Sequence, residues 1–192
     1  MRVQPRLPAD LDLDALSPTD RLYTRMGGIL AHRPRLASAF AEFGPVLARE
    51  AELPARLREL VRLRIAFHNQ CRSCMSIRYS SGRDAGVSED LVCSLARPSE
   101  SPDLSDAEKA ALRFADLFAT DHLAIDDEVF EALRRHFDDG EIVELAMVCA
   151  HYVASGRLMA VMRVTEDLPA AARAEGPVAP WALDGTVEVR DV

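Results

Sequence analysis

The sequence predicts an all-α protein of about seven to eight helices, and three observations carry that prediction. Apolar residues recur at helical spacing along most of the 192 residues, most clearly over residues 54–68. Helix-capping residues punctuate these segments, as in the capping box of residues 105–108. No convincing strand pattern precedes the alternating run at residues 186–189. The chain is therefore expected to fold as a helical bundle.

Each predicted helix begins or ends at a recognisable residue. Ser17 and Pro18 have the types favoured at an N-cap and at the first helical position. Gly44-Pro45 is expected to interrupt the helix that Pro34 opens. The helices are expected over residues 17–31, from residue 34 to the interruption, and over 54–68, 71–84, 88–97, 105–118, 126–137 and 142–164.

The two ends of the chain lack this periodicity. Residues 1–16 contain two prolines, and residues 169–192 are rich in Pro, Ala and Gly. We expect an extended N-terminal arm, one all-α domain over residues 17–168, and a C-terminal arm over residues 169–192. Trp181 is expected either to dock that arm into a neighbouring subunit or to lie in an exposed, floppy tail.

Charge excludes some classes of partner. Lys and Arg number 23 against 31 Asp and Glu, which gives a net charge of −8. This sign disfavours nucleic acid and anionic membranes, whose phosphates attract basic surfaces. The first 20 residues lack a basic, then apolar, leader pattern, so a cytoplasmic location is expected. In that compartment four cysteines favour a reactive or metal-binding use over a structural disulfide framework.

Cys71-Arg72-Ser73-Cys74 is the sharpest local motif. If a helix begins at Cys71, the two cysteines share a face and a modest adjustment allows a disulfide. Free N–H groups at the helix start favour thiolate over thiol, and Arg72 and Arg78 add positive charge. A thiolate is the form that attacks a peroxide or a disulfide, and a second thiol nearby can resolve the product.

Metal binding and simple packing are alternatives. His68-x-x-Cys71-x-x-Cys74 offers three zinc ligands, although no second CxxC follows. Haem attachment is disfavoured because Met75, not His, follows the second cysteine. Cys93 and Cys149 lie in apolar helical stretches and are expected to be small core residues.

Glu59 lies twelve residues before the first cysteine, on a helix face that leads into the CxxC turn. A carboxylate on that largely apolar face would be partly desolvated and could exchange a proton with a cysteine. The alternative is a surface glutamate paired with Arg56 or Arg62.

Together these residues resemble a known family. The run Glu59-Leu-Val-Arg-Leu-Arg-Ile-Ala-x-x-Asn69-x-Cys71-x-x-Cys74, followed by Ala85-Gly-Val-Ser-Glu89, resembles the carboxymuconolactone decarboxylase superfamily in its alkyl hydroperoxidase D-like, CxxC-containing branch. The resemblance covers roughly residues 30–165. It implies an all-α fold of the alkyl hydroperoxidase D-like type that assembles into trimers or hexamers.

The resemblance also implies roles for individual residues. Cys74 would attack a small hydroperoxide, Cys71 would resolve it as a disulfide, and Glu59 would transfer the proton. That disulfide would be the redox group, with no further cofactor or metal, and a lipoyl-bearing or thioredoxin-like dithiol protein would reduce it. The chain would then be a peroxiredoxin-type oxidoreductase.

Two positions depart from the family pattern. Arg78 and Ser73 stand where relatives carry histidines. Arg78 cannot act as a base, but it can hold a thiolate or a carboxylate as an ion pair, or it can point to solvent beside a surface acid. The alternatives to a peroxidase are a non-redox decarboxylase-like or isomerase-like enzyme that uses Glu59 with His68, and a redox-sensing or zinc-binding oligomer without turnover.

Overall fold

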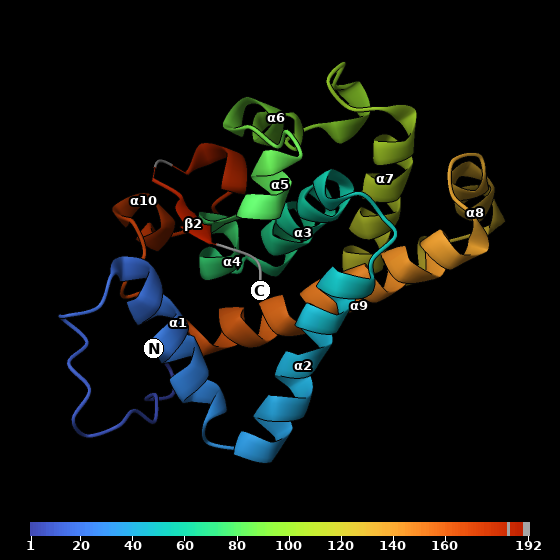
Figure 1. Ribbon diagram of the computed structural model, residues 1–192. Coiled ribbons are helices and arrows are strands. Elements are labelled where there is room, and N and C mark those ends of the chain that lie inside the picture. The colour runs from blue at the N-terminus through green and yellow to red at the C-terminus, as the bar shows by residue number, and fades with distance from the viewer. Residues whose placement is uncertain (184, 190–192) are drawn as a thin grey trace.

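The computed structural model describes residues 1–183 and 185–189, and it is all-α as predicted (Figure 1). The described residues form ten α-helices where seven to eight were expected, because the segment 71–84 is divided and a short helix forms in the C-terminal arm. The α-helices of the described residues are α1 (Pro18–Leu30), α2 (Pro34–Glu50), α3 (Ala55–Asn69), α4 (Arg72–Ser76), α5 (Ser80–Asp84), α6 (Glu89–Ser94), α7 (Asp106–Thr120), α8 (Asp127–Arg134), α9 (Asp139–Met162) and α10 (Ala170–Arg173). Three 3₁₀ turns, η1 (Pro98–Glu100), η2 (His122–Ala124) and η3 (Pro180–Ala182), join the later elements. The strands β1 (Ile77–Tyr79) and β2 (Val187–Val189) complete the described chain.

The main core surrounds α3, which packs against α7 and α9. The apolar stripe predicted for this helix is buried, with Leu60, Val61 and Ile65 fully enclosed. Both partner helices begin with a capping box, at Ser105 and at Asp138, which satisfies backbone donors that would otherwise lack partners. The turn that follows α3 therefore begins at the end of a helix that is packed into the core.

The expected interruption of α2 is wrong, because that helix runs through Pro45 without a break. A proline inside a helix removes one hydrogen bond and frees the carbonyl four residues earlier. That carbonyl belongs to Ala41, which is exposed, so water can satisfy it. None of the residues of α2 is fully buried.

The single helix expected over residues 71–84 is also wrong. The chain instead forms α4, then β1, then α5. β1 pairs in parallel with β2, with Ile77 opposite Val187 and Tyr79 opposite Val189. The partner strand lies more than 100 residues later, and local sequence does not reveal such a pairing. β2 falls within the alternating run seen in the sequence.

Both arms are docked on the domain. In the N-terminal arm the Arg2 amide donates to the Met162 carbonyl, and the Arg6 amide donates to the Gly28 carbonyl, both at 2.9 Å. Gly28 has to be glycine for this approach, because a Cβ there would lie 2.7 Å from the Pro5 Cβ.

Trp181 meets neither of its two expectations. Its ring packs against Phe67 of its own chain, with the ring centroids 4.8 Å apart. The Arg64 guanidinium lies 5.8 Å from the Trp181 ring centroid. The C-terminal arm therefore folds back onto α3 of the same molecule (Figure 1).

By length and composition α9 is apolar enough to cross a membrane. It lies across the bundle, where it packs against α3 and α7 (Figure 1). Its apolar character therefore has an explanation in the core, although Val143, Met147 and Val161 remain exposed.

Candidate active site

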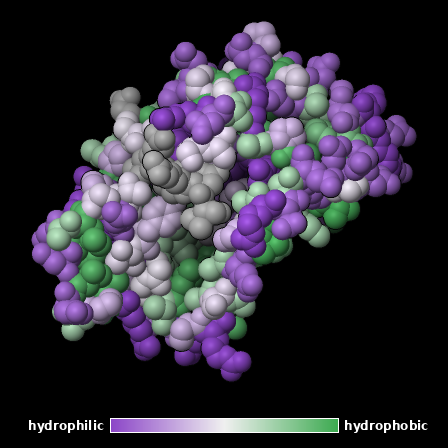
Figure 2. Space-filling model, in the orientation of Figure 1, coloured by the Kyte–Doolittle hydropathy of each residue, from purple (hydrophilic) through white to green (hydrophobic). Residues whose placement is uncertain are grey.

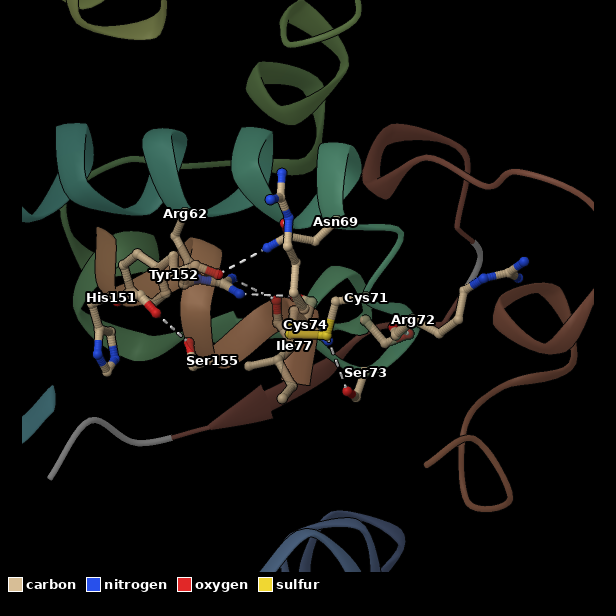
Figure 3. The surroundings of a disulfide bond; sticks show 12 residues. Arg62, Asn69, Cys71, Arg72, Ser73, Cys74, Ile77, His151, Tyr152 and Ser155 are labelled. Atoms are coloured by element: carbon tan, nitrogen blue, oxygen red, sulfur yellow. Dashed lines mark hydrogen bonds between the residues drawn. A yellow bond between two sulfur atoms is a disulfide. The ribbon is translucent and has the colours of Figure 1, made fainter. Parts of the chain in front are cut away.

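The two cysteines of the motif form a disulfide bond at the turn between α3 and α4 (Figure 3). Gln70 caps the C-terminus of α3, and its left-handed backbone (φ 50°) turns the chain back. Cys71 then caps α4, with its sulfur accepting from the Cys74 amide at 3.3 Å. The two Cα atoms lie 5.2 Å apart, as the spacing predicts.

The two sulfur-bearing residues differ in accessibility. Cys71 is fully buried, whereas Cys74 is only partly buried. A reagent from solvent therefore reaches Cys74 more easily. α4 has only five residues, so its aligned peptide dipoles favour a thiolate less than the longer predicted helix would.

Glu59 is buried, with an exposed fraction of 4%, and it forms a two-pronged ion pair with Arg62 on the next turn of α3. Both N–H···O distances are 2.6 Å. Burial alone would lower the pKa of Arg62, but the Glu59 carboxylate raises it above its ordinary value. Glu59 is thus desolvated, as the first interpretation predicts, and paired with Arg62, as the alternative predicts.

A glycine makes room for this buried pair. A Cβ at Gly82 in α5 would lie 2.5 Å from Cγ of Glu59, closer than side-chain atoms can approach. The Tyr79 amide, at the end of β1, also donates to the Glu59 carboxylate at 3.3 Å. The break of the predicted helix at β1 therefore shapes the carboxylate site.

Glu59 reaches the cysteine turn through Arg62. The Arg62 guanidinium donates to the carbonyls of Cys74 and Ile77, each at 2.8 Å (Figure 3). Its plane lies over the Tyr79 ring, 4.7 Å from the centroid. Arg62 therefore fixes the backbone of the second cysteine, while the carboxylate fixes Arg62.

Arg78 is buried and bonds away from the sulfur atoms. It forms an ion pair with Glu89, at 2.8 Å, and donates to the carbonyls of Met75, Ile77 and Pro180. One of the two expectations was that Arg78 pairs with a surface acid. Glu89 is such an acid, because its side chain is mostly exposed. The guanidinium itself does not point to solvent, with an exposed fraction of 5%.

His68 hydrogen-bonds to α7 and, among the described residues, to neither Glu59 nor the cysteines. Its Nε2 lies 2.6 Å from Asp116 on α7, and Arg64 also pairs with that carboxylate. Burial alone would raise the pKa of Asp116, but these partners lower it below its ordinary value. Glu59 and His68 are nine residues apart, which places them on opposite sides of α3. The geometry therefore does not bring Glu59 and His68 together. Within the described residues His68, Cys71 and Cys74 do not form a group that could hold a metal ion, and the two sulfur atoms are bonded to each other.

Sequence reasoning missed a polar contact that holds the end of α3 against α9. The Asn69 amide donates to the Tyr152 carbonyl at 2.8 Å and accepts from Arg157 at 3.0 Å (Figure 3). A Cβ at Gly156 would lie 2.5 Å from the Asn69 amide nitrogen. A glycine within the long apolar run was the available signal for this close approach.

The remaining two cysteines differ from each other. Cys149 is buried as predicted, and burial raises the pKa of its thiol. Cys93 is exposed, so its assignment to the core is wrong. It lies at the end of a helix of only six residues, where the side chain falls outside the packed face.

Known proteins share this fold. A protein of unknown function from Agrobacterium tumefaciens, whose name proposes an AhpD antioxidant-defence role, superposes with a TM-score of 0.62 at 24% identity, over 69% of this chain and 91% of its own. An uncharacterized peroxidase-related protein from Ralstonia eutropha with an alkylhydroperoxidase AhpD core gives a TM-score of 0.58 at 24% identity, over 82% and 90%.

Curated relatives are uncharacterized. One from Mycobacterium tuberculosis is 43% identical over 111 residues, which are 57% of this chain and 38% of that protein. The Escherichia coli protein YnjA is 30% identical over 114 residues, which are 59% of this chain and 60% of YnjA. The chain thus spans 38% and 60% of the length of these two relatives, less than two thirds of either.

The sequence model of the Carboxymuconolactone decarboxylase family matches residues 34–117, which include α3, the disulfide turn and most of α7. The CxxC disulfide and the all-α fold fit the AhpD-like members of that family. Over these residues the chain is similar to the Carboxymuconolactone decarboxylase family.

Proposed function

We propose that this protein is a thiol-dependent peroxidase or disulfide oxidoreductase that uses Cys71 and Cys74 as its redox pair. The observation that carries the proposal is the disulfide itself, with Cys71 buried and Cys74 partly exposed. An unequal pair of this kind suits a nucleophile that meets substrate and a resolving thiol that is shielded from it.

In the reduced protein the Cys74 thiolate attacks the outer oxygen of a small hydroperoxide. The O–O bond breaks, Cys74 becomes a sulfenic acid, and the alcohol leaves after taking up a proton. The Cys71 thiol then attacks the sulfenic sulfur, which forms the disulfide and releases water. A dithiol protein, lipoyl-bearing or thioredoxin-like, returns both cysteines to thiols by two exchange steps and is itself oxidised.

Glu59 is the group that we propose to exchange the proton. It is buried on the turn of α3 that faces β1, and Arg62 connects it to the Cys74 backbone. Arg62 acts in this scheme as a positioning residue. Arg78 binds four oxygen-bearing groups of the protein, so we assign it a structural role in holding the turn.

A homo-oligomer, trimeric or hexameric, forms part of the proposal. α2 exposes Leu36, Phe40 and Phe43, and α9 exposes Val143 and Met147. Figure 2 shows hydrophobic surface among hydrophilic side chains in the lower half of the view, where α1 and α2 lie. Exposed apolar helix faces of this kind are typical of subunit contacts. A sedimentation mass near the 21.2 kDa of one chain at micromolar concentration would refute assembly.

Thiol titration tests the redox function. The protein is reduced with dithiothreitol, desalted and treated with one equivalent of hydrogen peroxide or cumene hydroperoxide. We expect the loss of two thiols per chain, reversed by dithiothreitol, and no loss of this pair in Cys74→Ser. Turnover with an excess of dithiol then separates an enzyme from a sensor. Unchanged thiols after the peroxide pulse would overturn the proposal.

We propose a cytoplasmic location, where dithiol reductants are available.

A further inference from the structure

A pocket of about 260 Å³ opens beside the disulfide turn. Its walls come from Arg72 and Ser73 of the turn, from the end of α9, from the start of the N-terminal arm, and from α10. Ser73 is one of the lining residues, and its hydroxyl lies 3.5 Å from the Cys71 sulfur. The pocket therefore adjoins the buried half of the disulfide, and both docked arms are needed to form it.

Positive charge dominates the pocket. Four arginines line it, Arg2, Arg72, Arg163 and Arg173, and among the described residues none of its lining side chains is acidic. This arrangement is unusual in a chain whose net charge is −8. Arginines that line the same concave site repel one another, and a bound anion would reduce this repulsion.

Carboxylates of the protein do not neutralise these arginines. Arg72 donates to the carbonyls of Ala172 and Ala174, each at 2.9 Å, which are uncharged acceptors. Figure 3 shows its side chain extending away from the disulfide. Within the described part of the chain, Arg163 and Arg173 have exposed side chains without a hydrogen-bond or ion-pair partner. Their guanidinium groups are free to bind a ligand.

Arg163 carries a second signal. It ends α9 with a left-handed backbone, at φ 54°, a position that glycine fills at the lowest cost. A side chain in this conformation costs about 1 kcal/mol. The arginine at this position therefore opposes local stability, which suggests that its side chain serves another purpose.

The pocket is not wholly polar. Met159, Val164 and Ala172, which are buried or nearly so, contribute apolar surface to it. We propose that this pocket binds a small organic anion, with its carboxylate or phosphate held by the arginines and a short apolar body against these three side chains. The proposal concerns binding to the oxidised protein, so it holds whether or not the disulfide turns over peroxide.

Isothermal titration of the oxidised protein tests the proposal with three probes: hexanoate, its neutral analogue hexanamide, and inorganic phosphate. We expect hexanoate or phosphate to bind and hexanamide to bind at least about tenfold more weakly, which is the effect of losing one charged hydrogen bond. Tighter binding of hexanoate identifies a carboxylate site, and tighter binding of phosphate identifies a phosphate site. Equal binding of hexanoate and hexanamide would overturn the anion proposal, as would no binding of either anion up to about 10 mM.

Arg163→Gly separates binding from folding. It removes the guanidinium while relieving the left-handed backbone, so we expect an unchanged or higher melting temperature and a loss of affinity of about tenfold. Arg163→Asn, which also tolerates this conformation, should give the same loss. Arg113→Gln, at an exposed position on α7 outside the pocket lining, is the matched control and should leave affinity unchanged. Full affinity in Arg163→Gly would refute the assignment, whatever the thiol titration shows.

Discussion

Replacing Glu59 by glutamine tests the buried ion pair that supports the disulfide turn. The substitution keeps the shape of the side chain but removes its charge. Arg62 would then remain as a buried cation, held only by the carbonyls of Cys74 and Ile77 and by the neutral amide. Both members of the pair are at least 96% buried, so water cannot replace the lost charge without opening the core.

The expected cost follows from this geometry. Breaking one side of a buried pair costs about 3–5 kcal/mol. Glutamine can still accept one of the two hydrogen bonds from Arg62, so we expect a cost of about 3 kcal/mol for Glu59→Gln and about 5 kcal/mol for Glu59→Ala. For a chain of this size, each kcal/mol lowers the melting temperature by about 2–4 °C. We therefore expect a decrease of about 6–12 °C for Glu59→Gln.

Urea unfolding and thermal melts, followed by far-ultraviolet circular dichroism, measure this effect. Protein concentration is held constant, since assembly would change the apparent stability. Arg62→Gln and the double variant complete a mutant cycle. The double variant should be less destabilised than the sum of the two single variants, because it leaves no unpaired charge. A Glu59→Gln protein within about 1 kcal/mol of the parent would refute the account of this pair.

Three further predictions concern the same region. Gly82→Ala should lower the free energy of unfolding by about 1–3 kcal/mol, because the added methyl group would collide with the buried Glu59 side chain. Gly27→Ala in α1 is the control, because the space around its Cβ is open. It should be neutral or stabilising in the same urea titration. The pKa of Asp116 is lower in the folded state than in the unfolded state. The carboxylate therefore stabilises the fold fully at pH values above its unfolded-state pKa, and this stabilisation is lost as the pH falls through its folded-state pKa. Asp116→Asn should remove that part of the decrease in unfolding free energy at acid pH, and an unchanged pH profile would contradict this. Arg78→Ala should leave unchanged the pH midpoint at which iodoacetamide alkylates Cys74, measured in a protein in which Cys71 is replaced by serine. The same variant should speed proteolysis of the C-terminal arm. A raised midpoint would show that Arg78 does stabilise the thiolate.

Sequence patterns predicted the features that depend on neighbouring residues. The caps at Ser17, Ser105 and Asp126 all lie where their side chains predict a helix start. The spacing of the CxxC motif predicted that its two cysteines can form a disulfide. These signals are local, so one stretch of chain contains all the information required.

Features that depend on distant residues could not be predicted in this way. The end of β1 is set by β2, and the position of Trp181 is set by Phe67 and Arg64 on α3. The choice between Arg56 and Arg62 as the partner of Glu59 also depended on tertiary packing. Spacing allowed both, but only Arg62 lies on the side that β1 covers, while Arg56 pairs with Glu108.

The arginines near the disulfide were expected to activate a thiolate by their charge, but the structure gives them other partners. Arg72 and Arg78 donate mainly to main-chain carbonyls of residues 172–180 and of the turn, and they hold the C-terminal arm against it. Of the arginine side chains described, Arg62 is the one that hydrogen-bonds to the backbone of Cys74, and its own charge is largely balanced by Glu59. If Glu59 takes up a proton during turnover, that balance is lost and Arg62 becomes an unpaired cation beside Cys74. In the proposed mechanism that positive charge would lie beside the Cys74 backbone, because Arg62 donates to the Cys74 carbonyl.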